Sequence, residues 1–134
     1  MIDIDGLQVV SVHAIPTREF KEEKITGLLL PETRHTSASV GFVPPYGLQT
    51  PHYQDRPQRG DEIIFVYEGT FRVLSGGKRT DIFNTDKHGP VYILVRSGTP
   101  ASLENCGPEM VRFFSVFSPP FAPGETHFLE EPVN

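Results

Sequence analysis

Proline and glycine divide this chain into short segments, and that division limits what it can fold into. The sequence has 13 prolines and 12 glycines among its 134 residues, spread along its whole length. Proline fixes φ and lacks a backbone donor, and glycine is unfavourable inside regular elements, so both tend to end helices and strands. The few longer uninterrupted stretches have no apolar stripe at helical spacing. The pattern therefore predicts many short strands and little helix.

Ten candidate strands lie between these breaks. They cover residues 7–13, 24–30, 37–43, 49–53, 62–67, 70–75, 78–83, 91–95, 101–104 and 110–117. Gly76 and Gly77 mark the clearest hairpin, because adjacent glycines supply the positive φ angles that tight turns need. Residues 17–23 could form one helical turn, and residues 84–90 are expected to form a loop. So many short strands in one chain are typical of an all-β barrel or sandwich.

Length and charge exclude several classes of protein. A chain of 134 residues is long enough for one domain, and 12 basic against 17 acidic residues give a net charge of −5. An acidic chain is a poor match for a nucleic acid. We find neither an apolar run near the roughly 18 residues of a membrane span nor a signal peptide. Cys106 is the single cysteine, which excludes an internal disulfide. We expect a cytoplasmic single domain over residues 1–134, without nucleic-acid or membrane partners.

Two spaced motifs resemble those of the cupin superfamily. His52 and Gln54 precede Glu62, and six residues separate Glu62 from Gly69, as in the first motif of that family. Gly98 and Asn105 match the glycine and asparagine of its second motif. The resemblance implies a conical β-barrel, also called a double-stranded β-helix or jelly roll. The barrel core would cover about residues 25–118, and a tail over residues 119–134 would wrap its outside.

Within that superfamily the chain is most similar to ectoine synthases. The shared features include an exit strand that ends in Phe-x-Pro-Pro and a histidine, His127, seven residues after the second proline. Ectoine synthases close an acetylated diamino acid into a ring with loss of water, using iron held by a glutamate, a tyrosine and a histidine. The resemblance carries the first two ligands over to Glu62 and Tyr92. The histidine position falls at Pro100 or Ala101, where no ligand is present.

The metal-ligand positions are incomplete. A divalent metal needs three or four donors converging from different strands. Of the cupin set, His52 and Glu62 remain, while Gln54 and Ala101 replace the two other histidines. We therefore expect a barrel without a cofactor. Iron, zinc or nickel would be held by His52 and Glu62 only with a replacement ligand such as Tyr92 or His127.

Alternation along the strands assigns side chains to faces, because residues two apart share a face. If Glu62 points inward, so do Ile64 and Val66, whereas Ile63, Phe65 and Tyr67 lie on the other face. Ser115 and Phe117 share a face with Phe113, and the resemblance makes them pocket lining. The predicted catalytic residues are His52, Glu62 and Tyr92. The predicted substrate-binding residues are Gln54, Ile64, Ser115, Phe117 and His127.

The leading hypothesis is a small cupin enzyme that moves protons on a compact polar metabolite, as an isomerase, a cyclase or a dehydrating lyase. His52 would act as acid or base because its pKa lies near working pH, and Glu62 would raise that pKa. A non-catalytic small-molecule-binding cupin and a metal-dependent enzyme with replacement ligands remain alternatives, as does a purely structural His52. The apolar N-terminal residues, with Leu7 and Val9 among them, predict a homodimer.

Overall fold

The computed structural model describes residues 2–4, 7–9, 11, 15, 17–20, 23–28, 37–54, 61–118 and 126–129 of the chain. Within these residues it has fourteen strands and one short helix, so the all-β prediction is confirmed. The strands are β1 (Ile2–Ile4), β2 (Leu7–Val9), β3 (Thr17–Phe20), β4 (Glu23–Leu28), β5 (Ser37–Val43), β6 (His52–Gln54), β7 (Asp61–Glu68), β8 (Thr70–Ser75), β9 (Lys78–Arg79), β10 (Phe83–Asn84), β11 (Val91–Val95), β12 (Ser102–Asn105), β13 (Val111–Ser118) and β14 (Thr126–Phe128), and the helix is α1 (Thr85–His88). No helix in the described part of the chain has the length and apolar character of a membrane span.

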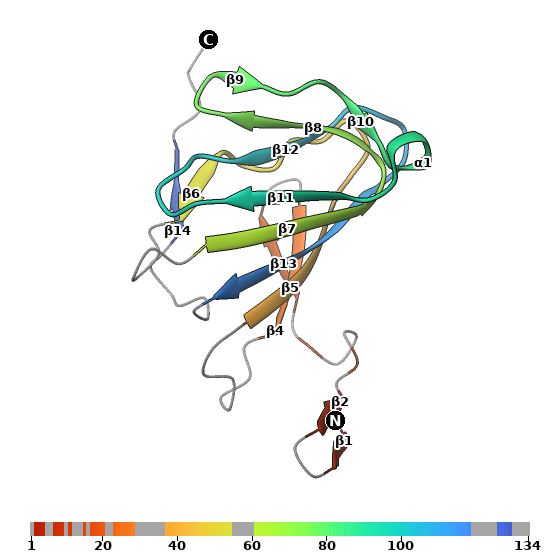
Figure 1. Ribbon diagram of the computed structural model, residues 1–134, viewed down its shortest axis with the longest axis vertical. Helices are drawn as coiled ribbons and strands as arrows, with labels where there is room; N and C mark the ends of the chain where they lie inside the picture. Colours follow the sequence, from red (N-terminus) through yellow and green to blue (C-terminus); the bar gives the residue numbers. More distant parts are fainter. Residues whose placement is uncertain are drawn as a thin grey trace.

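A six-stranded antiparallel sheet forms the larger wall of the barrel, in the order β11-β7-β13-β5-β4-β3. Figure 1 shows β11, β7, β13, β5 and β4 following one another across the molecule. On β7, Glu62, Ile64 and Val66 are buried while Ile63 and Tyr67 are exposed, as alternation predicted. The inward face continues onto β13, where Ser115 lies opposite Ile64 and Phe117 opposite Glu62.

The smaller wall is built around β8, which pairs with β10, β12 and β9. Two isolated bridges, Leu48 to Glu104 and His52 to Ala101, extend it from β12 towards β6. β6 in turn pairs with β14. The β8–β9 hairpin turns at Gly76 and Gly77, both at positive φ, as predicted.

Side chains from both walls form one apolar core. Its buried members are Val43, Ile64, Val66, Phe71, Val95, Leu103, Val111 and Phe113. Asn105 lies beside this core and is 2% exposed. Its Nδ2 donates to the carbonyl oxygens of Val43, Pro44 and Glu109 at 2.7–3.0 Å, and its Oδ1 accepts from the Gly107 N–H at 2.9 Å. This asparagine of the second motif therefore ties β12 to two loops.

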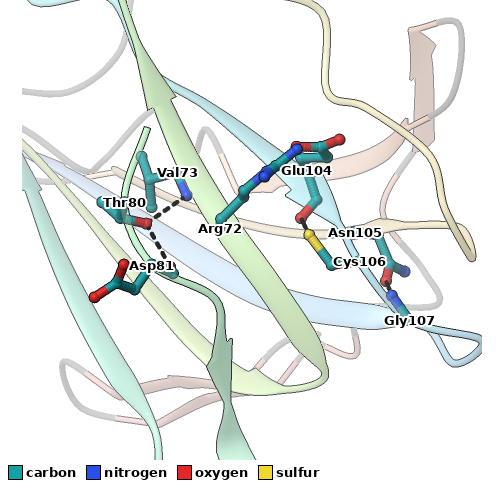
Figure 2. A network of polar contacts seen from close by, with 8 residues as sticks. All are labelled: Arg72, Val73, Thr80, Asp81, Glu104, Asn105, Cys106 and Gly107. Carbon is teal, nitrogen blue, oxygen red and sulfur yellow. Dashed lines mark hydrogen bonds and ion pairs between the residues drawn. The ribbon is translucent and has the colours of Figure 1, made fainter. Parts of the chain in front are cut away.

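Polar contacts also connect the smaller wall to its turns (Figure 2). Arg72 on β8 forms an ion pair with Glu104 on β12. The Thr80 hydroxyl accepts from the Val73 N–H at 3.0 Å and donates to the Asp81 carbonyl at 2.8 Å. These bonds hold the β8–β9 hairpin and the chain leaving it in register.

The predicted segments 17–23 and 84–90 differ from the structure. Thr17–Phe20 is strand β3 rather than a helical turn, because it pairs with β4 at the edge of the larger wall. The expected loop at 84–90 contains α1, whose first turn is capped by the Asn84 side chain. Part of the tail forms strand β14, which pairs with β6. The bulge expected between Gln54 and Glu62 and most of the tail lie outside the described residues.

Candidate functional site

A row of inward-facing side chains crosses the larger wall where β7 begins. The cross-strand neighbours in this row are Val95, Glu62, Phe117 and Ser37, and all four are buried. Glu62 is therefore a carboxyl group, 6% exposed, between two apolar side chains. Carboxyl groups are rarely buried on an apolar sheet face, so the position of Glu62 marks a functional candidate.

A second row crosses the smaller wall at the same end of the barrel. Ala101, His52 and Phe128 are neighbours on adjacent segments. Residues 96–100 lead directly from Val95 in the first row to Ala101 in the second. Figure 1 shows this end, where β6 and β14 lie and β7 begins, opposite the end that carries α1. We call the inward-facing residues His52, Gln54, Glu62 and Ser115 the polar end of the barrel.

The His52 ring is held in one orientation by the backbone. Its Nδ1 lies 2.7 Å from the Thr50 carbonyl oxygen, which can only accept, so Nδ1 carries a proton. In the neutral ring Nε2 is then an acceptor, and no described residue bonds it. Burial lowers the pKa of His52 below its ordinary value, and the bond to Thr50 opposes this only in part. The expectation that Glu62 raises this pKa is therefore wrong.

Gln54 shares the inward face of β6 with His52 and is 6% exposed. Its Oε1 accepts from the Thr126 hydroxyl on β14 at 2.8 Å. The bond leaves the amide nitrogen without a partner among the described residues. The backbone carbonyl of Gln54 accepts from the Gly98 N–H at 2.7 Å, which ties β6 to the loop between the two rows.

Ser115 and Ile64 lie one step deeper in the larger wall. They face each other across β13 and β7, and both are buried. Ile64 belongs to the apolar core, whereas the Ser115 hydroxyl has no hydrogen-bond partner in the described part of the chain. Together with Phe117 they form the larger-wall side of the polar end, on the face that the sequence predicted.

The structure does not bring Tyr92 to this group, which corrects its predicted role. Tyr92 lies opposite Phe65 in the β11–β7 ladder, and residues opposite each other in a ladder share a face. Phe65 alternates with Glu62 and Ile64, so both aromatic rings lie on the outer face of the larger wall. Tyr92 is 73% exposed, and its ring centroid is 4.7 Å from that of Phe65.

His127 is also placed away from the polar end. It lies opposite Tyr53 in the β14–β6 ladder, and the two rings stack at 5.0 Å. Tyr53 points to the face opposite His52 and Gln54, so the predicted substrate contact of His127 is corrected. Its neighbours contact the other two residues of β6 instead: the Thr126 hydroxyl donates to Gln54 Oε1, and the Phe128 ring, which is 48% exposed, lies 6.1 Å from the His52 ring. Sequence reasoning missed both, because only the pairing of β14 with β6 reveals them.

The described residues do not complete a metal site. No three His, Cys, Asp or Glu side chains among them come together as ligands. His52 and Glu62 supply two donors, whereas Ala101 stands beside His52 with none. A metal ion needs three or four donors, so this set does not fit one. Burial raises the pKa of the Cys106 thiol, which disfavours the reactive thiolate form.

Similarity to known proteins is found at the level of structure. No family model matches the chain, and no curated protein sequence matches it. The oxalate decarboxylase of Lactobacillus farciminis superposes with a TM-score of 0.70 at 19% identity, over 88% of this chain and 34% of that one. This chain thus spans about a third of that enzyme's length. A Klebsiella pneumoniae protein with a double-stranded β-helix domain matches with a TM-score of 0.69 at 19% identity, over 93% and 99% of the chains. The polyketide cyclase RemF of Streptomyces resistomycificus matches with a TM-score of 0.68 at 18% identity, over 93% and 88%.

Proposed function

The chain has the double-stranded β-helix fold of the cupin superfamily, and from that premise we propose that it is an enzyme that transfers protons on a compact polar metabolite. The observation that carries the proposal is the His52 ring, whose Nδ1 is bound to the Thr50 carbonyl while Nε2 remains an acceptor. A neutral imidazole with a free Nε2 is the form that a general base requires. Isomerisation, cyclisation and dehydration all begin with such a proton transfer.

The other residues of the polar end have supporting roles in this proposal. Glu62, on the larger wall, is the second group that donates or accepts a proton. Gln54 and Ser115 bind polar atoms of the substrate, because both are buried and carry polar groups without described partners. Ile64 and Phe117 form the apolar sides. RemF, which shares the fold, is a polyketide cyclase, and this supports an enzyme over a binding module.

An ectoine synthase-like reaction has less support than a metal-independent proton transfer. It would need an iron site with Glu62 and Tyr92 as ligands, and Tyr92 lies on the outer face. We therefore derive no step through a metal. We keep cyclisation as a candidate reaction, with His52 as the base and without a metal.

A mixed metabolite screen tests the proposal. Wild-type protein is incubated in D2O with hydroxy acids, oxo acids, N-acetylated amino acids and sugar acids, and NMR follows conversion or deuterium uptake. We expect at least one compound to react, and His52→Ala to lower its rate by about 100-fold or more. His88→Ala is the matched control, because His88 lies on α1 at the opposite end of the barrel.

The outcomes separate the alternatives. A folded His52→Ala protein with wild-type turnover contradicts the base assignment. Binding of a compound without conversion, again dependent on His52, would instead make the protein a non-catalytic binding cupin. Loss of folding in His52→Ala, shown by a much lower Tm, would make His52 a structural residue.

A further inference from the structure

The Gln54 amide carries an inference about the substrate, which rests on the function proposed above. Thr126 Oγ1 holds the amide by its oxygen, so the amide nitrogen is turned away from β14. Gln54 is 6% exposed, and no described residue accepts from this nitrogen. Buried donors in native proteins nearly always have an acceptor. The amide is therefore placed to donate to an oxygen atom of a bound molecule.

His52 presents the complementary group on the same strand face. Residues two apart on a strand are separated by about 6.7 Å, so one small molecule can contact both side chains. The amide of Gln54 donates, and Nε2 of neutral His52 accepts. A carbonyl compound matches this pair, because its oxygen accepts a hydrogen bond and the adjacent carbon carries an acidic hydrogen. We propose that the substrate is an oxo acid or ketone, bound through its carbonyl oxygen to Gln54 and deprotonated next to the carbonyl by His52.

The step balances without an oxidant or a further reactant. His52 Nε2 takes the proton, the C–H electron pair forms a carbon–carbon double bond, and the carbonyl electron pair moves to oxygen. The resulting enolate oxygen is held by the Gln54 amide, as a positioned donor stabilises developing charge. Return of the proton from the imidazolium to oxygen or carbon completes an isomerisation. Attack of the enolate carbon on a second carbonyl of the same molecule would complete a cyclisation.

Matched pairs of oxo and hydroxy compounds test the substrate class. The probes are pyruvate with lactate, 2-oxobutyrate with 2-hydroxybutyrate, and dihydroxyacetone with glycerol. NMR follows the side-chain amide signals of Gln54 during titration. We expect at least one oxo compound to shift these signals with an affinity tenfold or more above its hydroxy partner. Gln54→Met, which keeps the side-chain length and removes the donor, should abolish that preference.

The results distinguish this inference from the proposed function. Equal or tighter binding of the hydroxy partners, or no binding of any oxo compound, overturns the substrate class. If a hydroxy compound is converted in a His52-dependent way, the proposed function stands and this inference fails. If oxo compounds bind through Gln54 but His52→Ala still exchanges their protons at the wild-type rate, the base assignment fails instead. If Gln54→Met does not fold, the affinities of the wild-type protein for the oxo and the hydroxy compound of each pair decide whether the proposed substrate class is correct.

Discussion

His52 illustrates how burial and one backbone contact define the chemistry of a single side chain. The Thr50 carbonyl accepts from Nδ1 at 2.7 Å, which fixes the tautomer. Burial disfavours the charged ring and lowers its pKa, so the ring is neutral at pH 7. A base that is neutral across the physiological range needs no further partner to be ready for proton transfer.

The lowered pKa makes the stability of the protein depend on pH. The unfolded ring has a pKa of about 6.5, above that of the folded ring, so the unfolded chain binds more protons between these values. The stability contributed by neutral His52 is therefore complete above about pH 6.5. It is lost as the pH falls, by at most about 1.4 kcal/mol per pH unit. Urea unfolding at pH 7.5 and 5.5 should show a smaller loss for His52→Gln than for the wild type. Equal losses would contradict a buried neutral ring.

Two outward-facing residues should be dispensable for activity. Tyr92 is 73% exposed and His127 stacks on Tyr53, away from the polar end. We expect Tyr92→Phe and His127→Ala to keep turnover within about twofold of the wild type, since neither touches the substrate-facing side. Glu62→Gln, by contrast, should lower turnover, because it removes the inward-facing carboxyl group. Turnover assays on the compound found by the screen check this, and a tenfold loss in either outward variant would restore an ectoine synthase-like arrangement.

At the scale of the elements, β14 positions the polar end although it comes from the C-terminal tail. It pairs with β6 and places Thr126 on Gln54 and Phe128 beside His52. The loop between β11 and β12 holds β6 from the other side through Gly98. Two connections from distant parts of the sequence thus determine where the His52–Gln54 pair points.

Removal of the Thr126 hydroxyl should affect binding more than folding. Thr126→Val keeps the shape of the side chain but frees the Gln54 amide to rotate. A single hydrogen bond contributes about 1 kcal/mol to stability, so Tm should change little. We expect KM to rise several-fold with kcat less affected. Thr80→Val removes a comparable hydroxyl at the β8–β9 hairpin and serves as the control. An unchanged KM in Thr126→Val would mean that the amide orientation does not depend on β14.

Gly69, the glycine of the first motif, is required by backbone geometry. It adopts φ +125°, and a Cβ there would lie 2.8 Å from Val111 Cγ2 and 2.9 Å from the Met110 carbonyl oxygen. Gly69→Ala should destabilise the protein by about 3 kcal/mol, from strain together with this clash. Gly77→Ala also has positive φ but no atom within 4 Å, so it should cost only about 1 kcal/mol. Chemical denaturation compares the two, and equal costs would contradict the clash.

The whole molecule separates an apolar core from a polar end within one barrel. Eight buried apolar residues pack between the two walls. β6, which carries His52 and Gln54, and the start of β7, which carries Glu62, lie at one end of the barrel (Figure 1). We expect folding of this barrel not to require a metal, because burial of apolar side chains stabilises it.

A metal analysis tests this property of the molecule. Protein purified without chelator should carry much less than one equivalent of iron, zinc or nickel, since the described donors are too few. EDTA should leave its Tm unchanged. A full equivalent that disappears in Glu62→Ala would contradict this expectation and indicate a ligand outside the described residues.

The fold class follows from local properties of the sequence. Proline and glycine confine the elements to short strands, and alternation along β7 and β13 correctly places Glu62, Ile64, Ser115 and Phe117 on the inward face. These features depend on neighbours a few residues away, so a sequence pattern can predict them. The same holds for the Gly76–Gly77 hairpin, where local φ angles determine the turn.

The polar end depends on contacts between residues far apart in the sequence, and only the tertiary structure decides it. His52 meets Ala101 and Phe128 through pairing with two distant segments, and the resulting burial lowers its pKa, which no local pattern predicts. Similarity of order along the chain predicts a catalytic role for Tyr92, but its register opposite Phe65 turns it outward. A shift of one residue in a strand reverses the face of every side chain. Position in a motif therefore indicates which residues can act, and strand register and desolvation decide which of them do.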